Sequence, residues 1–167
     1  MLVKRVETYV LDGNNASKIP LPHDCVIKDI REDDDSLIID FEDDLSYHDA
    51  IRAVHPDAQT LTLRFHLEYG GPDGAKAYGG LQGIYRYRHS KKHGEGYMLV
   101  KSLKELRKLV SECVCPATYL YHYVADHQVI VELCVDHSTL LMLCTDYVEF
   151  EWTLKDPGRT DPIEPVS

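Results

Sequence analysis

The sequence lacks the apolar runs that would carry it into or across a membrane. Its 167 residues include no uninterrupted apolar stretch near the roughly 18 residues that a membrane-spanning helix needs. The first residues, from Met1 to Glu7, contain no apolar segment typical of a signal peptide. The five cysteines form no Cys-x-x-Cys pair, and an odd number of thiols without an export signal indicates a reducing compartment. We therefore expect a cytoplasmic protein with free thiols and no membrane partner.

The motifs of common enzyme classes are also missing. There is no Gly-x-Ser-x-Gly nucleophile elbow, and the glycine-rich stretch 70–83 lacks the Gly-Lys-Ser/Thr ending of a phosphate-binding loop. The run from Gly79 to Gly83 precedes a predicted strand, whereas a dinucleotide-binding fingerprint requires a helix there. We expect a non-enzymatic protein that uses no cofactor.

Charge is distributed unevenly along the chain. The net charge is −10, yet residues 81–111 hold 8 Lys and Arg against 2 acidic residues, and both flanking segments are acidic. An acidic body repels nucleic acid and membrane surfaces and attracts basic partners. The same excess of charge also serves ordinary solubility.

Alternating apolar and polar residues predict a sheet that is mostly antiparallel. The predicted strands cover residues 2–11, 26–30, 36–41, 60–69, 84–89, 97–101, 118–125, 128–136, 139–145 and 148–154. The second and third form a hairpin around the acidic turn 32–35, and three consecutive strands on short turns in the C-terminal third predict a meander. Strand 139–145 is apolar on both faces, as a central strand would be. Six glycines between residues 70 and 83 predict a long mobile loop.

One helix has clear start and stop signals. Ser102 and Glu105 have the spacing of a capping box, and Pro116 prevents continuation. A shorter helix is predicted within residues 44–55, with Ser46 as its N-cap. Together these elements predict one α+β domain over residues 1–155, followed by a disordered, acidic and proline-rich tail over residues 156–167.

Acidic residues concentrate around the first predicted hairpin. Closely spaced carboxylates on a rigid sheet can mimic a phosphate backbone and occupy the basic cleft of a nucleic-acid enzyme. The alternative is that these residues are simply solvated turns between strands. The candidate partner-binding residues are Asp33, Asp34, Asp35, Asp43 and Asp44.

The stretch from Leu21 to Phe41 resembles a class of small β-rich bacterial proteins. Many of these open with a His-Asp-Cys or His-Asp-Ser strand start, here His23-Asp24-Cys25, and some are immunity proteins of toxin systems. The resemblance covers roughly residues 21–69. It implies a non-catalytic inhibitor that binds a toxin. Phage-encoded inhibitors of bacterial defence nucleases, the anti-CRISPR class, share the small and acidic profile. The expected partner is therefore a basic protein, either a toxin or a nuclease.

Two further functions remain open from the residues alone. A metal-assisted hydrolase would use His23, His122, His127 and His137, although their spacing repeats no known zinc motif. A single-stranded nucleic-acid binder would use a basic and aromatic hairpin, although the acidic body opposes this. Its contacts would be Tyr85, Arg86, Tyr87, Arg88, Lys91 and Lys92. The edge strands of the predicted meander also offer a surface through which two copies can pair as a homodimer.

Overall fold

Two five-stranded antiparallel sheets form the body of the protein. The structure, a computed structural model, describes residues 2–33, 35–70, 76–78 and 80–155. Sheet A contains, in spatial order, β1 (Leu2–Val10), β12 (Tyr147–Lys155), β4 (Ala58–His66), β3 (Ser36–Phe41) and β2 (Ile27–Asp33). Sheet B contains β8 (Gly94–Leu99), β7 (Gly80–Ser90), β11 (His137–Cys144), β10 (Gln128–Val135) and β9 (Thr118–Ala125). The predicted α+β class with mostly antiparallel strands is confirmed.

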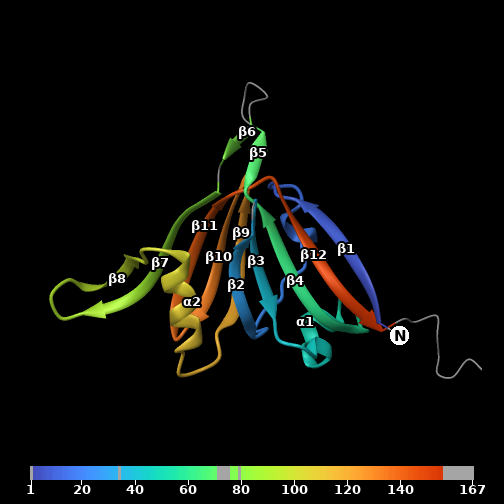
Figure 1. The fold of residues 1–167 in the computed structure, drawn as a ribbon, viewed down its shortest axis with the longest axis horizontal. Helices are drawn as coiled ribbons and strands as arrows, with labels where there is room; N and C mark the ends of the chain where they lie inside the picture. Colours follow the sequence, from blue (N-terminus) through green and yellow to red (C-terminus); the bar gives the residue numbers. More distant parts are fainter. Residues whose placement is uncertain (1, 34, 71–75, 79, 156–167) are drawn as a thin grey trace, which may run out of the picture.

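The two sheets are joined along one side. The amide of Ile27 donates a 2.8 Å hydrogen bond to the carbonyl of Ala117, and an isolated bridge pairs Val26 with Thr118. This contact connects β2 to β9, each the outermost strand of its sheet. The opposite outermost strands, β1 and β8, have one hydrogen-bonded neighbour each among the described residues. Figure 1 shows β1 beside β12 on one side of the molecule and β8 projecting on the other.

One core lies between the sheets. Alternate residues of the predicted strands point inward, so that Leu61, Leu63 and Phe65 of β4 face the same core as Val129, Val131 and Leu133 of β10. Trp152, on β12, is fully buried in this core. Period-two alternation therefore identified the buried face of these strands correctly.

The predicted C-terminal meander is present in sheet B, but the last strand is not part of it. β9, β10 and β11 are sequential neighbours in sheet B, but β12 crosses to sheet A and pairs with β1 and β4. A short turn does not by itself decide in which of two sheets the next strand lies. β11 is a central strand, as predicted, but its outer face is not buried, since Met142 is 38% exposed.

The longer predicted helix is α2 (Leu103–Ser111), and its capping box is present. The Ser102 hydroxyl accepts a 3.1 Å hydrogen bond from the amide of Glu105. The Glu105 carboxylate in turn accepts a 3.0 Å bond from the amide of Lys101. Leu106 inserts fully into the core. The capping residues therefore place the start of the helix as expected.

The shorter predicted helix is reduced to a 3-10 turn, η2 (Leu45–Tyr47), and one helical turn, α1 (Asp49–Arg52). The expected cap is wrong, because Ser46 lies within η2 and its hydroxyl bonds to the Asp44 carboxylate. Tyr47 is 82% exposed whereas Ile51 is buried, so these two apolar side chains do not face the core together. Another 3-10 turn, η1 (Ala16–Lys18), follows β1.

The described parts of the glycine-rich stretch belong to strands, contrary to the predicted loop. β5 (Glu68–Gly70) pairs with β6 (Lys76–Tyr78), and β7 already begins at Gly80. Gly83 lies inside β7, where a Cβ atom would be 2.6 Å from the ring of Tyr85. Glycine therefore leaves room for an aromatic ring to lie over the strand, and its presence does not indicate a loop.

Some predictions lie outside the described residues. These are Asp34, residues 71–75 of the expected loop and the expected tail at residues 156–167. Among the described residues, no helix has the length and apolar character to cross a membrane.

Candidate protein-binding site

The outer face of sheet B carries a broad group of tyrosine and aliphatic side chains. Five of them expose more than a third of their surface: Tyr97 (47%), Leu99 (65%), Tyr121 (46%), Tyr123 (51%) and Met142 (38%). Half-buried side chains lie between them. We call the whole set the tyrosine face, which consists of Tyr85, Tyr87, Tyr97, Leu99, Tyr121, Tyr123, Ile130, Glu132, Leu140 and Met142.

Strand register brings these residues together. Leu99 is opposite Tyr85, Tyr85 is opposite Leu140, Leu140 is opposite Glu132, and Glu132 is opposite Tyr121. A second row runs from Met142 through Ile130 to Tyr123. Residues directly opposite one another in an antiparallel sheet share a face, and their Cβ atoms lie about 5 Å apart. The tyrosine face is thus one continuous surface that spans all the strands of sheet B.

Hydrogen bonds hold the tyrosine hydroxyls in place. Tyr123 donates to one oxygen of Glu132 at 3.0 Å, while Ser138 donates to the other at 2.9 Å. Ser138 is also 2.9 Å from the hydroxyl of Tyr97, so this chain of bonds runs from β9 to β8. The hydrogen bond to Glu132 raises the pKa of Tyr123, so this hydroxyl stays protonated. Restrained aromatic side chains lose little conformational entropy when a partner binds.

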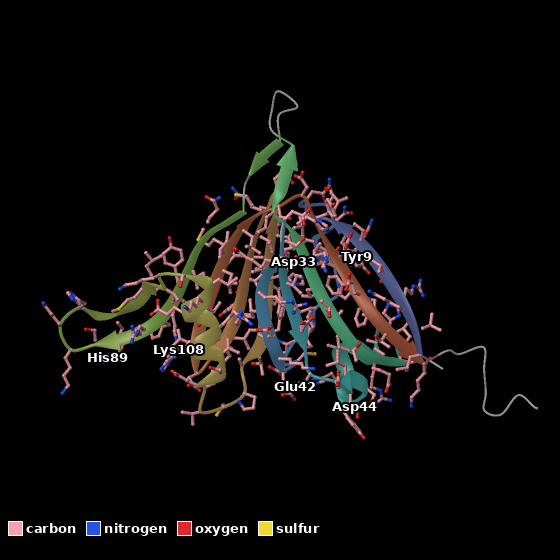
Figure 2. All side chains as sticks on the ribbon, in the orientation of Figure 1. Tyr9, Asp33, Glu42, Asp44, His89 and Lys108 are labelled. Atoms are coloured by element: carbon pink, nitrogen blue, oxygen red, sulfur yellow. The ribbon has the colours of Figure 1, made fainter. Side chains whose placement is uncertain are left out.

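The four acidic candidate residues that the structure describes are not gathered at one place. Asp33 and Asp35 lie at the β2–β3 turn, whereas Asp43 and Asp44 follow the other end of β3. Figure 2 shows Asp33 toward the upper end of the sheet and Glu42 with Asp44 at its lower end. All four described residues are exposed. The strand β3 between them has six residues, so the turn before it and the residues after it lie roughly 20 Å apart.

On the outer face of sheet A, arginine side chains pair with several of the nearby carboxylates. The Arg31 guanidinium bonds to Asp40, and the Arg64 guanidinium lies 3.6 Å from both Asp33 and Glu151. Ile38 lies opposite both arginines and is buried beneath this layer. Such mixed and exposed ion pairs are typical of a solvated sheet surface, and they contribute little to stability. The density of acidic residues in the sequence therefore overstated the negative charge available on this face.

The basic hairpin formed by β7 and β8 divides its side chains as the alternation predicted. Tyr85 and Tyr87 face outward and belong to the tyrosine face. Arg86 points to the opposite side, where it donates bonds of 3.0 and 3.3 Å to the carbonyl of Val135. Arg88 is on the same side as Arg86 and is exposed, while Lys91 and Lys92 form the turn. Arg86 is thus engaged in the fold, and the expected row of free cations is incomplete.

The four candidate histidines are not brought together either. His127 and His137 flank the two ends of β10. His122 points into the protein, where its Nδ1 atom lies 2.8 Å from the Tyr119 hydroxyl, and His23 lies 2.7 Å from the carbonyl of Leu120. Within the part of the chain that the structure describes, no three His, Cys, Asp or Glu side chains are placed to hold a metal ion.

A cleft of about 620 Å³ lies between α2 and β2. Its main polar feature is a paired contact of Arg107 with both oxygens of Asp29, at 3.1 and 3.2 Å. Cys113 is at one end, and burial raises the pKa of its thiol, which keeps it protonated and unreactive. Ser111 donates its hydroxyl proton to the carbonyl of Lys108. These side chains satisfy one another and present no pairing of a nucleophile with a base.

No protein-family model, curated protein or solved structure matches this chain. The candidate site therefore depends on its own geometry. Sequence reasoning identified Tyr85 and Tyr87 but missed Tyr97, Leu99, Tyr121, Tyr123 and Met142. The signal for Tyr121 and Tyr123 was their spacing of two within a predicted strand, which places both on one face.

Proposed function

We propose that this chain is a non-enzymatic binding protein that docks a basic protein partner on the tyrosine face. The observation that carries the proposal is the exposure of five large aromatic and aliphatic side chains on one continuous sheet surface. Soluble proteins rarely expose such a group without a partner for it. Tyrosine is enriched in protein interfaces because one ring supplies both apolar area and a hydrogen-bonding hydroxyl.

Charge favours a basic partner. The chain carries a net charge of −10, and the tyrosine face contains Glu132 at its centre with Glu95 beside Tyr87. Lysine and arginine side chains of a partner can pair with these carboxylates and also pack on tyrosine rings through cation–π contacts. A phosphate backbone would meet the same carboxylates and be repelled, which disfavours nucleic acid as the ligand.

The two pairs of exposed aspartates have a supporting role in partner binding. Asp33 and Asp35 at one end of the β2–β3 hairpin, and Asp43 and Asp44 at the other, extend the negative field of the body. Such exposed charges accelerate association with a basic partner more than they strengthen the final complex. Together with the resemblance of residues 21–69 to immunity-type proteins, this supports an inhibitor that blocks a toxin or a nucleic-acid-handling enzyme.

The test compares which proteins of the native host are captured by three forms of the chain. The first form is unchanged, the second carries Tyr121→Ala and Tyr123→Ala, and the third carries Tyr47→Ala. Tyr47 is a matched control, because it is 82% exposed but lies in η2, outside the tyrosine face. We expect the double variant to lose a partner that the other two forms retain. That partner should be basic, and its binding should weaken as salt increases.

Equal capture by all three forms would refute the proposal. Charge reversal at Asp43 and Asp44 separates the contribution of the exposed aspartates from that of the tyrosine face. It should slow association and leave the dissociation rate nearly unchanged, since the residues lie outside the tyrosine face. A labelled single-stranded oligonucleotide completes the test, and tight, salt-dependent binding to it would favour the nucleic-acid function instead.

A further inference from the structure

β1 is a long and regular outermost strand. It has nine residues, it contains no proline, and its register against β12 is uninterrupted from Leu2 to Val10. Among the described residues, it pairs with β12 alone. Exposed edges in natural proteins are usually shortened, bulged, interrupted by proline or lined with charged side chains, because a regular free edge recruits another strand. Of these features β1 has only the charged residues Lys4, Arg5 and Glu7. The other outermost strand, β8, has six residues and contains Gly94 and Gly96, which weaken it as a pairing surface.

Apolar side chains on β1 remain exposed to solvent. Leu2 is 57% exposed, Val6 50% and Val10 53%. These three residues are four apart, so they lie on the same face of the strand. Lys4 and Thr8 alternate with them on that face. The other face carries Val3, Arg5, Glu7 and Tyr9, and Arg5 lies 3.2 Å from Glu7 within the strand.

We propose that two copies of this chain form a homodimer by antiparallel pairing of β1 about a two-fold axis at Val6. In this register, each residue meets a complementary one of the second copy. The opposed pairs are Val6 with Val6, Arg5 with Glu7, Lys4 with Thr8, Val3 with Tyr9 and Leu2 with Val10. Every apolar residue lies opposite an apolar or aromatic one, and the Arg5–Glu7 pair occurs twice across the interface because of the two-fold symmetry.

Neighbouring registers are disfavoured by charge. A two-fold axis perpendicular to the sheet keeps the same face of β1 outward in both copies. Even-numbered residues can therefore lie opposite only even-numbered residues of the second copy, and odd-numbered opposite odd-numbered, in every allowed register. One step in either direction places Arg5 opposite Arg5 of the second copy, or Glu7 opposite Glu7. Like charges directly opposite one another destabilise a strand pair. The sequence of β1 is thus self-complementary in one register, as an isologous interface requires.

The neighbouring structure supports β1 in this arrangement. The Glu7 carboxylate accepts a 2.7 Å bond from Tyr9 and lies 2.6 Å from His55 Nε2. Tyr9 packs edge-on against Phe150, with ring centroids 5.3 Å apart. One acidic side chain is therefore already held in place, while Arg5 keeps 61% of its side chain exposed to reach the second copy. Pairing would extend sheet A of one copy into sheet A of the other.

The first experiment measures mass in solution. Sedimentation equilibrium of the full chain should give a mass that rises with concentration from 19.1 kDa toward twice that value. Val6→Lys places two ammonium groups opposite each other and should hold the mass at that of one chain. Leu99→Lys is the matched control, because Leu99 is an even more exposed aliphatic residue on the other free edge. It should leave the dimer intact.

The second experiment tests the register. Val6→Cys places a thiol opposite its own copy at a Cα separation of about 5 Å, which suits a disulfide. Mild oxidation should therefore produce a covalent dimer well above the background of the unchanged chain, in which Cys115 is exposed. Thr8→Cys should not exceed that background, because Thr8 faces Lys4 in this register.

A mass of one chain at every concentration would overturn the proposal, as would a dimer that Leu99→Lys abolishes and Val6→Lys does not. The dimer and the tyrosine face can be tested separately. Val6→Lys should retain the basic partner while it loses the dimer, and Leu99→Lys, on the tyrosine face, should do the reverse.

Discussion

The hydroxyl of Tyr119 lies 2.8 Å from His122 Nδ1, and both side chains point from β9 into the protein. A β-bulge makes this possible, since the register with β10 shifts between Glu132 and Leu133 and leaves two nearby residues of β9 on the inner face. Tyr119 is fully buried, and desolvation raises its pKa, so its hydroxyl remains a donor. Desolvation lowers the pKa of His122 to about 4, so its imidazole is neutral at pH 7.

This arrangement predicts that the protein loses stability in mild acid. An unfolded histidine takes up a proton below about pH 6.5, whereas folded His122 resists protonation down to about pH 4. The unfolded state therefore binds more protons in this range, and the free energy of unfolding should fall by up to about 3 kcal/mol as the pH decreases across it. Below pH 4 both states are protonated and this contribution no longer changes. Denaturant unfolding at several pH values measures the effect.

Two variants identify His122 as the origin of that acid sensitivity. His122→Gln should remove most of the decrease between pH 6.5 and pH 4. Tyr119→Phe should lower stability at every pH while leaving the decrease in place, because burial and not the hydrogen bond is what lowers the pKa. An unchanged pH profile in His122→Gln would contradict this account.

A second prediction concerns Asp136, which anchors the chain after α2. Its carboxylate accepts hydrogen bonds of 3.0 to 3.1 Å from the amides of Val114 and Cys115, and these bonds lower its pKa. Its φ angle is +59°, which asparagine tolerates better than alanine. Asp136→Asn should lower the melting temperature at pH 7, and Asp136→Ala should lower it further.

The stability that Asp136 contributes should decrease as the pH falls. A carboxyl whose pKa is lowered by folding stabilises the protein above its ordinary pKa, and this stabilisation is lost as the pH falls through the folded value. The difference in melting temperature between the unchanged chain and Asp136→Asn should therefore shrink in acid. A difference that stays constant down to pH 2 would show that the charge has no part in it.

A third prediction concerns the N-cap of α2. Ser102→Ala removes the acceptor for the Glu105 amide and should cost about 1 kcal/mol of unfolding free energy. Ser111→Ala in the last turn of the same helix is the matched control and should cost less, since its hydroxyl donates to a carbonyl that water can also reach. Urea unfolding of both variants makes the comparison, and equal losses would argue against the cap.

A fourth prediction concerns packing beneath α2. Leu106 is fully buried, whereas Leu109 of the same helix is only partly buried. Leu106→Ala should destabilise the protein by about 2–5 kcal/mol through lost apolar burial and the cavity it leaves. Leu109→Ala should cost clearly less. Similar losses at the two positions would mean that the helix packs with a different face.

Local patterns were enough to locate most of the elements. The alternation in 118–125 and 128–136 predicted β9 and β10, and the Ser102–Glu105 spacing predicted the start of α2. Prediction failed where a residue had a role that depends on distant neighbours. Gly83 indicated a loop, yet it makes room for the ring of Tyr85 within a strand. Ser46 looked like a cap, yet the left-handed Asp44 before it begins a 3-10 turn instead.

The candidate site could be predicted only in part. Two of its residues, Tyr85 and Tyr87, were singled out as a stacking surface because they alternate with Arg86 and Arg88. Nothing in the sequence placed them beside Tyr121 and Tyr123, which are more than thirty positions away in the chain. The acidic residues were grouped because they are close in sequence, but the length of β3 separates them in space.

By itself, the sequence of this protein determined the strands, their inward faces and the capped helix. Side-chain periodicity and capping act over a few residues, so they can be read locally. The tertiary structure decided which strands became neighbours: it placed β12 between β1 and β4, left β1 at a free edge and assembled the tyrosine face. Those outcomes depend on hydrogen bonding and burial between segments that are far apart in the chain, and no local pattern encodes them.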